Sequence, residues 1–281
     1  MVEDGNEIFL IERCAAFDQA MLGKMITEEQ RKRALEDIRE NIARNGQHIY
    51  CVYGGMTPRF AYTIGVSESV GVELILAGAI FYMLDDVAKI LEYTVAELKA
   101  SRARELVEVA GLGSFTLRKV DSSWTRELML GVFDYYQKKE IPALQIVPDQ
   151  DHWTIDVPDM SMPLSRNQEP IWKWLREPWA YPVPEDSTAA TDLAALRGDR
   201  ITEACRWEED EWELFAGAGP DVPKDEMRVV ALGTLLAADP SLEPVVNLTI
   251  GTGMWRHDGS SKWQQWVKKG QTAQTQGTPE N

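Results

Sequence analysis

Residues 48–81 read HIYCVYGGMTPRFAYTIGVSESVGVELILAGAIF, and this stretch decides the fold of the first half of the chain. Residues 48–54 alternate in the way that is typical of a strand, and GGMTP then supplies a turn. Residues 59–66 predict a second strand. Residues 72–81 are almost all apolar, so they predict a third strand that is central in its sheet.

Helical patterns surround these strands. ITEEQRKRALEDIRENIARNG (26–46) predicts a helix with Thr27 as its N-cap, Gln30 completing a capping box, and Gly46 just beyond its C-terminus. Further elements are expected at 83–108 (helix), 113–120 (strand), 124–139 (helix, capped by Ser123) and 141–149 (strand). Strands and helices mixed in this order predict an α+β domain with a largely antiparallel sheet.

The amino-acid composition changes after Pro158, where proline and tryptophan become frequent. We therefore expect two α+β domains with largely antiparallel sheets, separated by a linker. The expected boundaries are 1–160 for the first domain, 161–189 for the Pro/Trp-rich linker, 190–270 for a smaller α+β domain, and 271–281 for a polar, disordered tail.

Within the smaller domain, ITEACRW (201–207) and WELFAG (212–217) predict the two strands of a hairpin. RVVAL (228–232) predicts a further strand, and GTLLAADPSLEPVV (233–246) predicts a helix broken at its prolines. SSKWQQWVKK (260–269) predicts a closing helix.

Composition limits the kind of partner. The formal net charge of −16 argues against binding to nucleic acid or to an anionic membrane, because both need a basic surface. The three cysteines, Cys14, Cys51 and Cys205, lie far apart and form neither a disulfide framework nor a zinc motif. No signal peptide or membrane-length apolar run is present, so a cytoplasmic protein is expected. The glycine pairs lack the context of a phosphate-binding loop, and no cofactor is expected.

Four segments of the first domain resemble a bacterial family called domain of unknown function 4262. They are NGQHIYCVYG, PRFAYTIGV, VELILAG and ALQIVPDQDHWTID, and the resemblance covers about residues 35–160. This chain departs from the family pattern at Asn45, Val66 and Val72, where the family has His, Leu and Pro. The family has no established catalytic residues, so the resemblance implies none here.

The smaller domain resembles immunity-protein domains of bacterial toxin systems that are related to suppressor of fused. The segments that carry this likeness are WELFAG, RVVALGTLLAADPSL and GTGMWR. The resemblance implies a binding role against a protein toxin.

Three residues of the first domain are weak candidates for catalysis: Glu73, His48 and Asp149. Glu73 opens an apolar strand, where it is either a buried functional acid or a partly hydrated residue at the strand end. His48 lies three residues from Cys51, but residues three apart on a strand point to opposite faces, which disfavours a Cys/His dyad. Cys51 is therefore expected in the core.

The segment DQDH (149–152) brings possible metal ligands close together in sequence. Asp149, Asp151 and His152 supply carboxylate and imidazole groups, but no glycine turn or distal glutamate completes a metal-binding loop. No metal is therefore expected.

The stretch RWEEDEWELFAG (206–217) contains four consecutive acids, a fifth acid one residue on, and two tryptophans. It fits the solvated tip of a hairpin, a docking site for a basic partner, or a metal site, although it lacks histidine. The candidate partner-binding residues are Trp207, Glu208, Glu209, Asp210 and Glu211. Trp212 shares a strand face with Leu214 and is expected to be buried.

These patterns favour a non-catalytic bacterial interaction protein, of the immunity type by resemblance, whose acidic, tryptophan-flanked surface binds a basic protein partner. The alternative is a small-molecule-binding enzyme with a pocket between the first sheet and the helix around residues 84–107. The sequence does not determine the oligomeric state.

Overall fold

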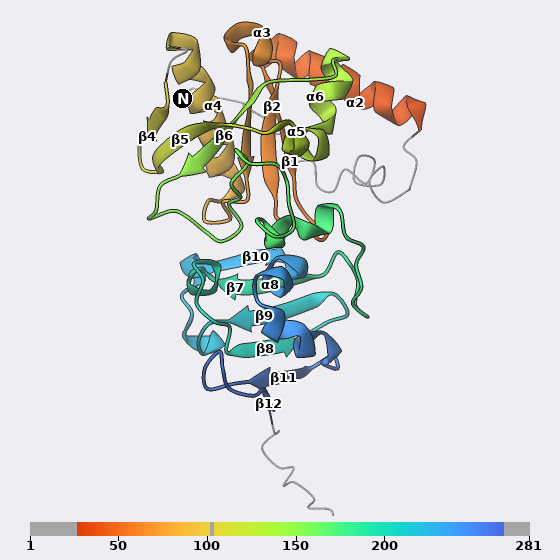
Figure 1. The fold of residues 1–281 in the computed structure, drawn as a ribbon, viewed down its shortest axis with the longest axis vertical. Helices are drawn as coiled ribbons and strands as arrows, with labels where there is room; N and C mark the ends of the chain where they lie inside the picture. The colour runs from red at the N-terminus through yellow and green to blue at the C-terminus, as the bar shows by residue number, and fades with distance from the viewer. Residues whose placement is uncertain (1–26, 102–103, 267–281) are drawn as a thin grey trace, which may run out of the picture.

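The structure is a computed structural model that describes residues 27–101 and 104–266, and these build two six-stranded sheets, one beyond the other along the long axis (Figure 1). Helices accompany both sheets, so the α+β fold class is confirmed. In the described part of the chain, none of the helices combines the length and the apolar character needed to span a membrane.

The first sheet has the strand order β1-β2-β3-β6-β5-β4. Its strands are β1 (His48–Val52), β2 (Phe60–Ile64), β3 (Glu73–Ala77), β4 (Leu106–Val109), β5 (Gly113–Lys119) and β6 (Ala143–Pro148). β3 and β6 pair in parallel, and the other neighbours are antiparallel. The three strands expected within residues 48–81 are therefore present as one antiparallel unit, with the apolar β3 buried inside the sheet.

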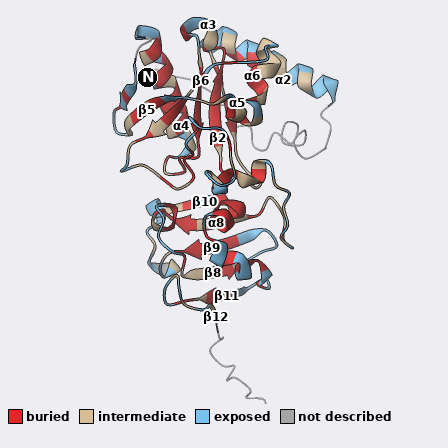
Figure 2. Cartoon of the chain, in the orientation of Figure 1, coloured by how far each residue is buried: buried red, intermediate tan, exposed pale blue. Residues whose placement is uncertain are grey.

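Helices cover both faces of the first sheet. They are α2 (Glu28–Asn45), α3 (Ser67–Val70), α4 (Leu84–Ala100), α5 (Ser122–Leu128) and α6 (Leu130–Tyr136). One core cluster contains Ile90 and Leu91 of α4. The cluster on the opposite face contains Ile38 of α2, Trp124 of α5 and Val132 of α6. Figure 2 shows the strands of this sheet as largely buried, which follows from its position between two helical layers.

The first helix has the ends that its sequence predicts. Thr27 accepts a hydrogen bond from Gln30 N, the Gln30 side chain reaches back to the backbone of Thr27, and Gly46 adopts a left-handed conformation. The capping box and the C-terminal glycine are thus both confirmed.

Two helix predictions are wrong in their boundaries. The helix expected over 83–108 ends at Ala100, and Leu106–Val109 forms β4 because its alternating side chains pair with β5 in an antiparallel hairpin. The helix expected over 124–139 is split at Met129 into α5 and α6. Its cap is Asp121, whose carboxylate accepts a hydrogen bond from Ser123 N, and not Ser123 itself.

The strand expected over 72–81 also ends early, at Ala77. Gly78 has φ +68°, and a Cβ atom at this position would lie 2.1 Å from the backbone oxygen of Asp156. Only glycine fits this close approach of two backbones, so the chain leaves the sheet here. Residues 79–82 then form a turn that contacts the second sheet.

The second sheet has the strand order β10-β7-β9-β8-β11-β12. Its strands are β7 (Thr188–Asp192), β8 (Glu203–Arg206), β9 (Glu211–Phe215), β10 (Met227–Ala231), β11 (Thr252–Trp255) and β12 (Gln264–Gln265). Its helical segments are α7 (Leu193–Leu196), η2 (Gly219–Asp221), η3 (Lys224–Glu226), α8 (Leu232–Ala238) and η4 (Pro240–Asn247). β7 and β9 pair in parallel, and the remaining neighbours are antiparallel.

Most predictions for the second half are confirmed: the hairpin, the RVVAL strand and the broken helix are present as β8–β9, β10 and α8–η4. The closing helix expected over 260–269 is wrong in its described part, where β12 pairs with β11. Residues 267–281, including the expected tail, lie outside the described residues. β7 and β11 were not expected, since TAATD and TGMW carry weak local patterns.

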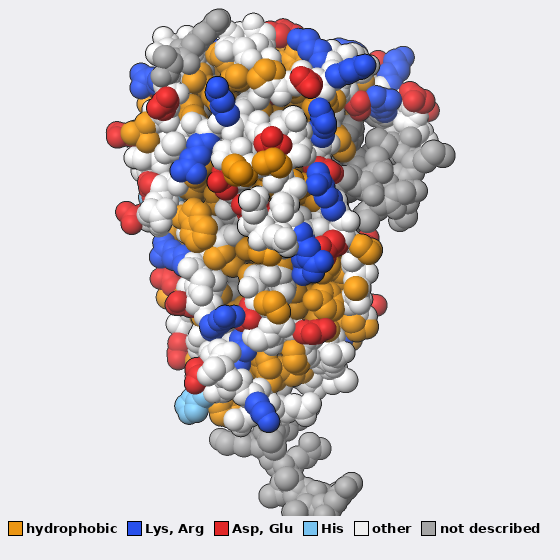
Figure 3. All heavy atoms as spheres, in the orientation of Figure 1, with side chains coloured by type: hydrophobic (Ala, Val, Ile, Leu, Met, Phe, Trp, Pro, Cys, Tyr) orange, Lys and Arg blue, Asp and Glu red, His pale blue; other side chains and the backbone are white. Residues whose placement is uncertain are grey.

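The second sheet is covered by helices on one face. Trp212 and Leu214 of β9 share a buried cluster with Leu235 of α8 and Val246 of η4. Side chains of the other face are more exposed; Val229 of β10 is 64% exposed. Figure 3 shows acidic and basic side chains interspersed over one side of the whole molecule, without a patch of a single sign.

The segment between the sheets contacts both of them. It contains the 3₁₀ helix η1 (Pro170–Leu175). Trp172 Nε1 donates to the backbone oxygen of Asp156 at 3.0 Å, and Trp174 Nε1 donates to Gly233 O of α8 at 2.9 Å. The Arg228 side chain of β10 donates to the backbone oxygens of Ile80 and Phe81. The turn after β3 is thereby bonded to the second sheet.

Candidate functional site

The acidic stretch forms the tip of the β8–β9 hairpin. The two strands pair as far as Arg206 and Trp212, and residues 207–210 make the turn, closed by a 2.9 Å hydrogen bond from Trp207 N to Glu211 O. The side chains of Glu208, Glu209, Asp210 and Glu211 are all exposed. None of these carboxylates has an ion-pair partner within residues 27–101 and 104–266.

Arg206 is the nearest basic residue in sequence, and its charge is used inside the hairpin. Its guanidinium lies 4.7 Å from the ring centroid of Trp212 and donates to the backbone oxygens of Glu208, Glu209 and Leu248. It therefore fixes the turn through carbonyl groups and leaves the neighbouring carboxylates unneutralised. Trp212 is 2% exposed, as its strand position predicts.

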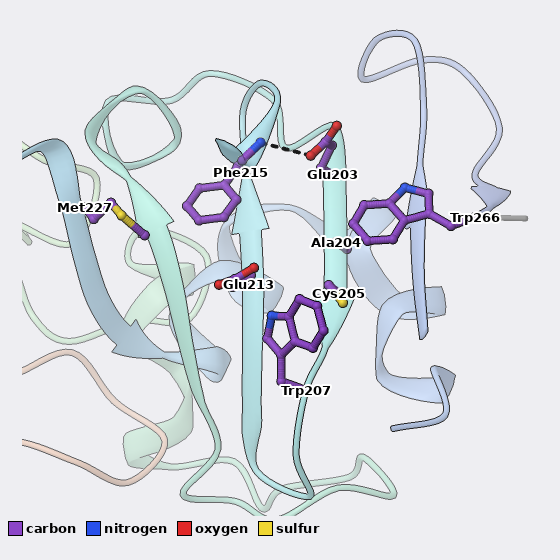
Figure 4. A pocket seen from close by; sticks show the side chains of 9 residues that line it. Glu203, Ala204, Cys205, Trp207, Glu213, Phe215, Met227 and Trp266 are labelled. Atoms are coloured by element: carbon purple, nitrogen blue, oxygen red, sulfur yellow. Dashed lines mark hydrogen bonds between the residues drawn. The ribbon is translucent and has the colours of Figure 1, made fainter. Parts of the chain in front are cut away.

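The uncovered face of the second sheet contains a hollow of about 380 Å³ next to this hairpin. Its lining residues are Glu203, Ala204, Cys205, Trp207, Glu213, Phe215, Gly219, Met227 and Trp266. Figure 4 shows the indole of Trp207 beside the carboxylate of Glu213, with Trp266 across β8 on the other side. Trp207 and Trp266 are each 46% exposed, so both offer aromatic surface to a ligand. We call this feature the Trp207–Trp266 hollow.

Strand pairing explains why these side chains gather. Glu203 lies opposite Phe215, and Cys205 lies opposite Glu213, so these four side chains share one face of β8 and β9. Gly253 on β11 lies opposite Cys205, and a Cβ atom there would be only 2.8 Å from the Trp266 ring. A glycine at this point allows the indole to lie directly on the sheet.

The charge of the hollow is negative. Among the described residues, two carboxylates line it and no lysine, arginine or histidine does. Glu203 accepts a hydrogen bond from Gly219 N at 3.0 Å, whereas the half-buried carboxylate of Glu213 has no hydrogen-bond or ion-pair partner among the described residues. The Cys205 thiol donates to Thr252 O, and burial together with the nearby Glu213 carboxylate raises its pKa to about 11. The thiol is therefore protonated at neutral pH and unsuited to nucleophilic chemistry.

The sequence pointed to Trp207 at this site but not to the other lining residues. The alternation of β8 and β9 was a usable signal, because it places Glu213 on the same strand face as Glu211. Met227 and Trp266 are brought to the hollow by the pairing of strands that are distant in sequence. No local sequence pattern predicts this pairing.

Glu73 lies at a different place, at the start of β3 in the first sheet, and it is fully buried. Its carboxylate accepts hydrogen bonds from four donors: Thr63 Oγ1 at 2.5 Å, Tyr136 Oη at 2.7 Å, Ser67 N at 2.8 Å and Gly65 N at 3.1 Å. The expectation of a partly hydrated strand end is wrong, because the Gly65–Ser67 turn and α6 close over the side chain. Burial raises the pKa of Glu73, and the donated hydrogen bonds act in the opposite direction.

His48 and Cys51 belong to opposite faces of β1. Cys51 lies in the core cluster under α4, and burial raises the pKa of its thiol to about 11. His48 contacts Asn41 of α2 at 3.2 Å through Nδ1, and burial lowers its pKa to about 4. The two side chains therefore do not form a nucleophile–base pair, as their spacing on a strand implies.

The DQDH segment forms a hydrogen-bonded turn after β6. Asp149 accepts hydrogen bonds from Ser114 N at 2.8 Å and from the backbone of Asp151 and His152. The Nδ1 atom of His152 lies 2.6 Å from Asp149 Oδ1. Over residues 27–101 and 104–266, no group of three or more His, Cys, Asp or Glu side chains is placed to hold a metal ion.

Residues 41–153 match the family model described as domain of unknown function (DUF4262). This DUF4262 region contains β1 to β6 and all of Glu73, His48 and Asp149, and it ends before the second sheet begins. The resemblance found in the first-domain sequence is therefore confirmed. No curated protein and no solved structure matched the chain. The likeness of the second sheet to suppressor-of-fused-related immunity domains stays a prediction.

The buried acid of the DUF4262 region gives a testable pH dependence. Because the pKa of Glu73 is raised above its unfolded value of about 4.3, its contribution to stability is fully present below that value and is lost as pH rises through the folded pKa. We expect the free energy of unfolding of the wild type, relative to Glu73→Gln, to fall from pH 4 towards neutrality. Urea denaturation at a series of pH values measures this difference. A difference that grows with pH would show that the four donors outweigh burial.

Proposed function

We propose that this chain is a non-catalytic binding protein of the bacterial cytoplasm that docks a basic protein partner on the uncovered face of its second sheet. One observation carries the proposal: half-exposed Trp207 lies between a row of acids at the hairpin tip and an acidic hollow, and the described part of the chain supplies no ion-pair partner to those acids and no basic residue to the lining of the hollow. Tryptophan supplies contact area at interfaces, while exposed carboxylates attract a basic partner over longer distances.

The acids at the hairpin tip and the Trp207–Trp266 hollow contribute to binding in different ways. Glu208, Glu209, Asp210 and Glu211 are exposed, so they act mainly on the rate of association, which salt should screen. Trp207 and the hollow supply the short-range contacts. A basic protein toxin is the concrete partner that we propose, in line with the resemblance of this half to immunity domains.

The enzyme alternative has weaker support. The space between the first sheet and α4 is filled by apolar core residues such as Val87, Ile90 and Leu91. Glu73, His48 and Asp149 each have their own set of hydrogen-bond partners, and no hydrogen bond or ion pair among the described residues joins one to another. An active site that uses these residues together is therefore not supported.

A peptide-display selection against the full-length chain tests the proposal. We expect peptides enriched in lysine and arginine, with association rates that fall as salt rises. The combined variant Glu208→Gln, Glu209→Gln, Asp210→Asn and Glu211→Gln should associate with these peptides about tenfold more slowly at low salt. Its free energy of unfolding should change by no more than roughly 0.5 kcal/mol, because exposed charges contribute little.

A matched control separates local docking from net charge. The variant Glu29→Gln, Glu36→Gln, Asp37→Asn and Glu40→Gln removes the same charge from exposed positions of α2. It should keep most of the association rate. Equal rates for both variants, or selected peptides without an excess of basic residues, would contradict docking at the hairpin.

A further inference from the structure

We infer that the Trp207–Trp266 hollow receives the guanidinium group of an arginine side chain from the basic partner. This rests on the proposed function for the identity of the partner, but the chemistry of the hollow can be tested by itself. The hollow, at about 380 Å³, is within the size range of protein sites that hold a small ligand, which is about 300–1,000 Å³.

The state of the two carboxylates indicates a cation. Glu213 is half-buried and has no counter-charge or hydrogen-bond donor among the described residues. Its cross-strand neighbour Cys205 donates its thiol hydrogen to Thr252 O, so the thiol does not donate a hydrogen bond to Glu213. Glu203 uses Oε2 for Gly219 N, and its Oε1 has no hydrogen bond in the described part of the chain. A half-buried carboxylate is only partly hydrated, and a cationic ligand would supply the counter-charge and the hydrogen-bond donors that the described residues do not.

The acceptors of the hollow favour a cation that carries N–H donors. A quaternary ammonium ion binds aromatic rings but has no hydrogen to donate to Glu213 or Glu203. Guanidinium has five N–H donors in a planar fork, which suits a hollow lined by two acceptor carboxylates, Glu213 of β9 and Glu203 of β8.

The aromatic walls favour guanidinium over the ammonium of lysine. Trp207 and Trp266 expose parts of their indole rings on the same sheet face, and Figure 4 shows Phe215 on the side nearer Met227. Guanidinium is flat and weakly hydrated, so it stacks on indole at a smaller desolvation cost than an ammonium group. The lysine side chain is thus the weaker ligand of the two.

The experiment observes the indole N–H signals of the full-length, ¹⁵N-labelled protein by NMR. Trp207→Phe and Trp266→Phe variants assign the two signals. N-acetyl-L-arginine amide, N-acetyl-L-lysine amide and tetramethylammonium chloride are then titrated at constant ionic strength. We expect saturable shifts of both signals with the arginine derivative at a Kd of about 1–10 mM, as for a few unassisted cation–π and charged contacts. The lysine derivative and tetramethylammonium should bind several-fold more weakly.

Two variants test the role of Glu213. Glu213→Gln should weaken binding of the arginine derivative about tenfold, because it removes a charge-assisted hydrogen-bond acceptor. Glu108→Gln, on an exposed position of β4 in the first sheet, should leave it unchanged. Trp207→Ala provides a second perturbation of the hollow and should also weaken binding.

The inference is overturned if neither indole signal shifts saturably, if lysine amide or tetramethylammonium binds as tightly as the arginine derivative, or if Glu213→Gln binds like the wild type. Its failure is distinct from failure of the proposed function. Selected basic peptides that bind without shifting the Trp207 and Trp266 signals would support docking and reject the arginine site. If the arginine derivative binds the hollow but the selection yields no basic peptides, the arginine site is supported and docking of a basic partner is rejected.

Discussion

Replacing Asp156 by alanine is expected to lower the free energy of unfolding by about 3–5 kcal/mol, the cost of removing one partner from a buried charged cluster. Asp156 is 2% exposed; its carboxylate accepts hydrogen bonds from Thr154 Oγ1 at 2.6 Å and Ile80 N at 3.2 Å, and the charge of Arg59 acts on it. The alanine variant would leave these two donors without their acceptor and the Arg59 guanidinium without the nearby negative charge. The loss should affect both sheets, because Ile80 also bonds to Arg228 of β10.

Asp159→Ala is the matched control, three residues along the same segment. Asp159 is exposed, and its carboxylate accepts hydrogen bonds from Ser161 N and Ser161 Oγ. This substitution should cost no more than about 1 kcal/mol. Urea denaturation followed by circular dichroism compares the two variants. Equal midpoints would mean that the Asp156 cluster does not hold the turn after β3 to the rest of the molecule.

The second large effect is expected at the acidic hairpin, where two tryptophans five residues apart should respond differently. Trp212→Ala should destabilise the protein by about 3–5 kcal/mol, because it leaves a cavity in the core of the second sheet. Trp212 is 2% exposed and packs between that core and the guanidinium of Arg206. Trp207 is 46% exposed, so Trp207→Ala should change the free energy of unfolding by less than about 1 kcal/mol.

The same pair of variants should separate folding from binding. Trp207→Ala is expected to weaken binding of selected basic peptides while it leaves the denaturation curve nearly unchanged. A strongly destabilised Trp207→Ala variant would place this side chain in the core and would remove it from the docking surface. An unaffected stability for Trp212→Ala would contradict the burial of the β9 inner face.

Strands and helix ends with strong local patterns were predictable from the sequence. Alternation over residues 48–54, the apolar run that begins at Val72, and the capping box at Thr27 each depend on neighbours within a few residues. By contrast, Leu106–Val109 continues a helical pattern and becomes a strand only because β5 is available as a partner. β7 is similar: TAATD has little strand character but is held between β9 and β10.

Only the hairpin-tip part of the candidate site was predictable from the sequence. A run of acids between two strand-like segments identifies an exposed turn, so Trp207 and Glu208–Glu211 could be named from the sequence. Glu73 was identified as an unusual acid, but its four donors come from β2, the turn after it and α6, which no local pattern brings together. The hollow itself combines residues as distant as Glu203 and Trp266.

Local sequence patterns are enough to establish the α+β class, the central position of β3, the hairpin with its acidic tip and the opposite faces of His48 and Cys51, because periodicity and turn chemistry act over a few residues. Tertiary structure alone decided where α4 ends and which face of the second sheet stays uncovered, since these depend on which distant strands and helices pack together. It also decided that Glu213, an ordinary strand residue in sequence, lies in the Trp207–Trp266 hollow with no hydrogen-bond or ion-pair partner among the described residues. Pairing of β8 with β11 and of β11 with β12 produces that environment.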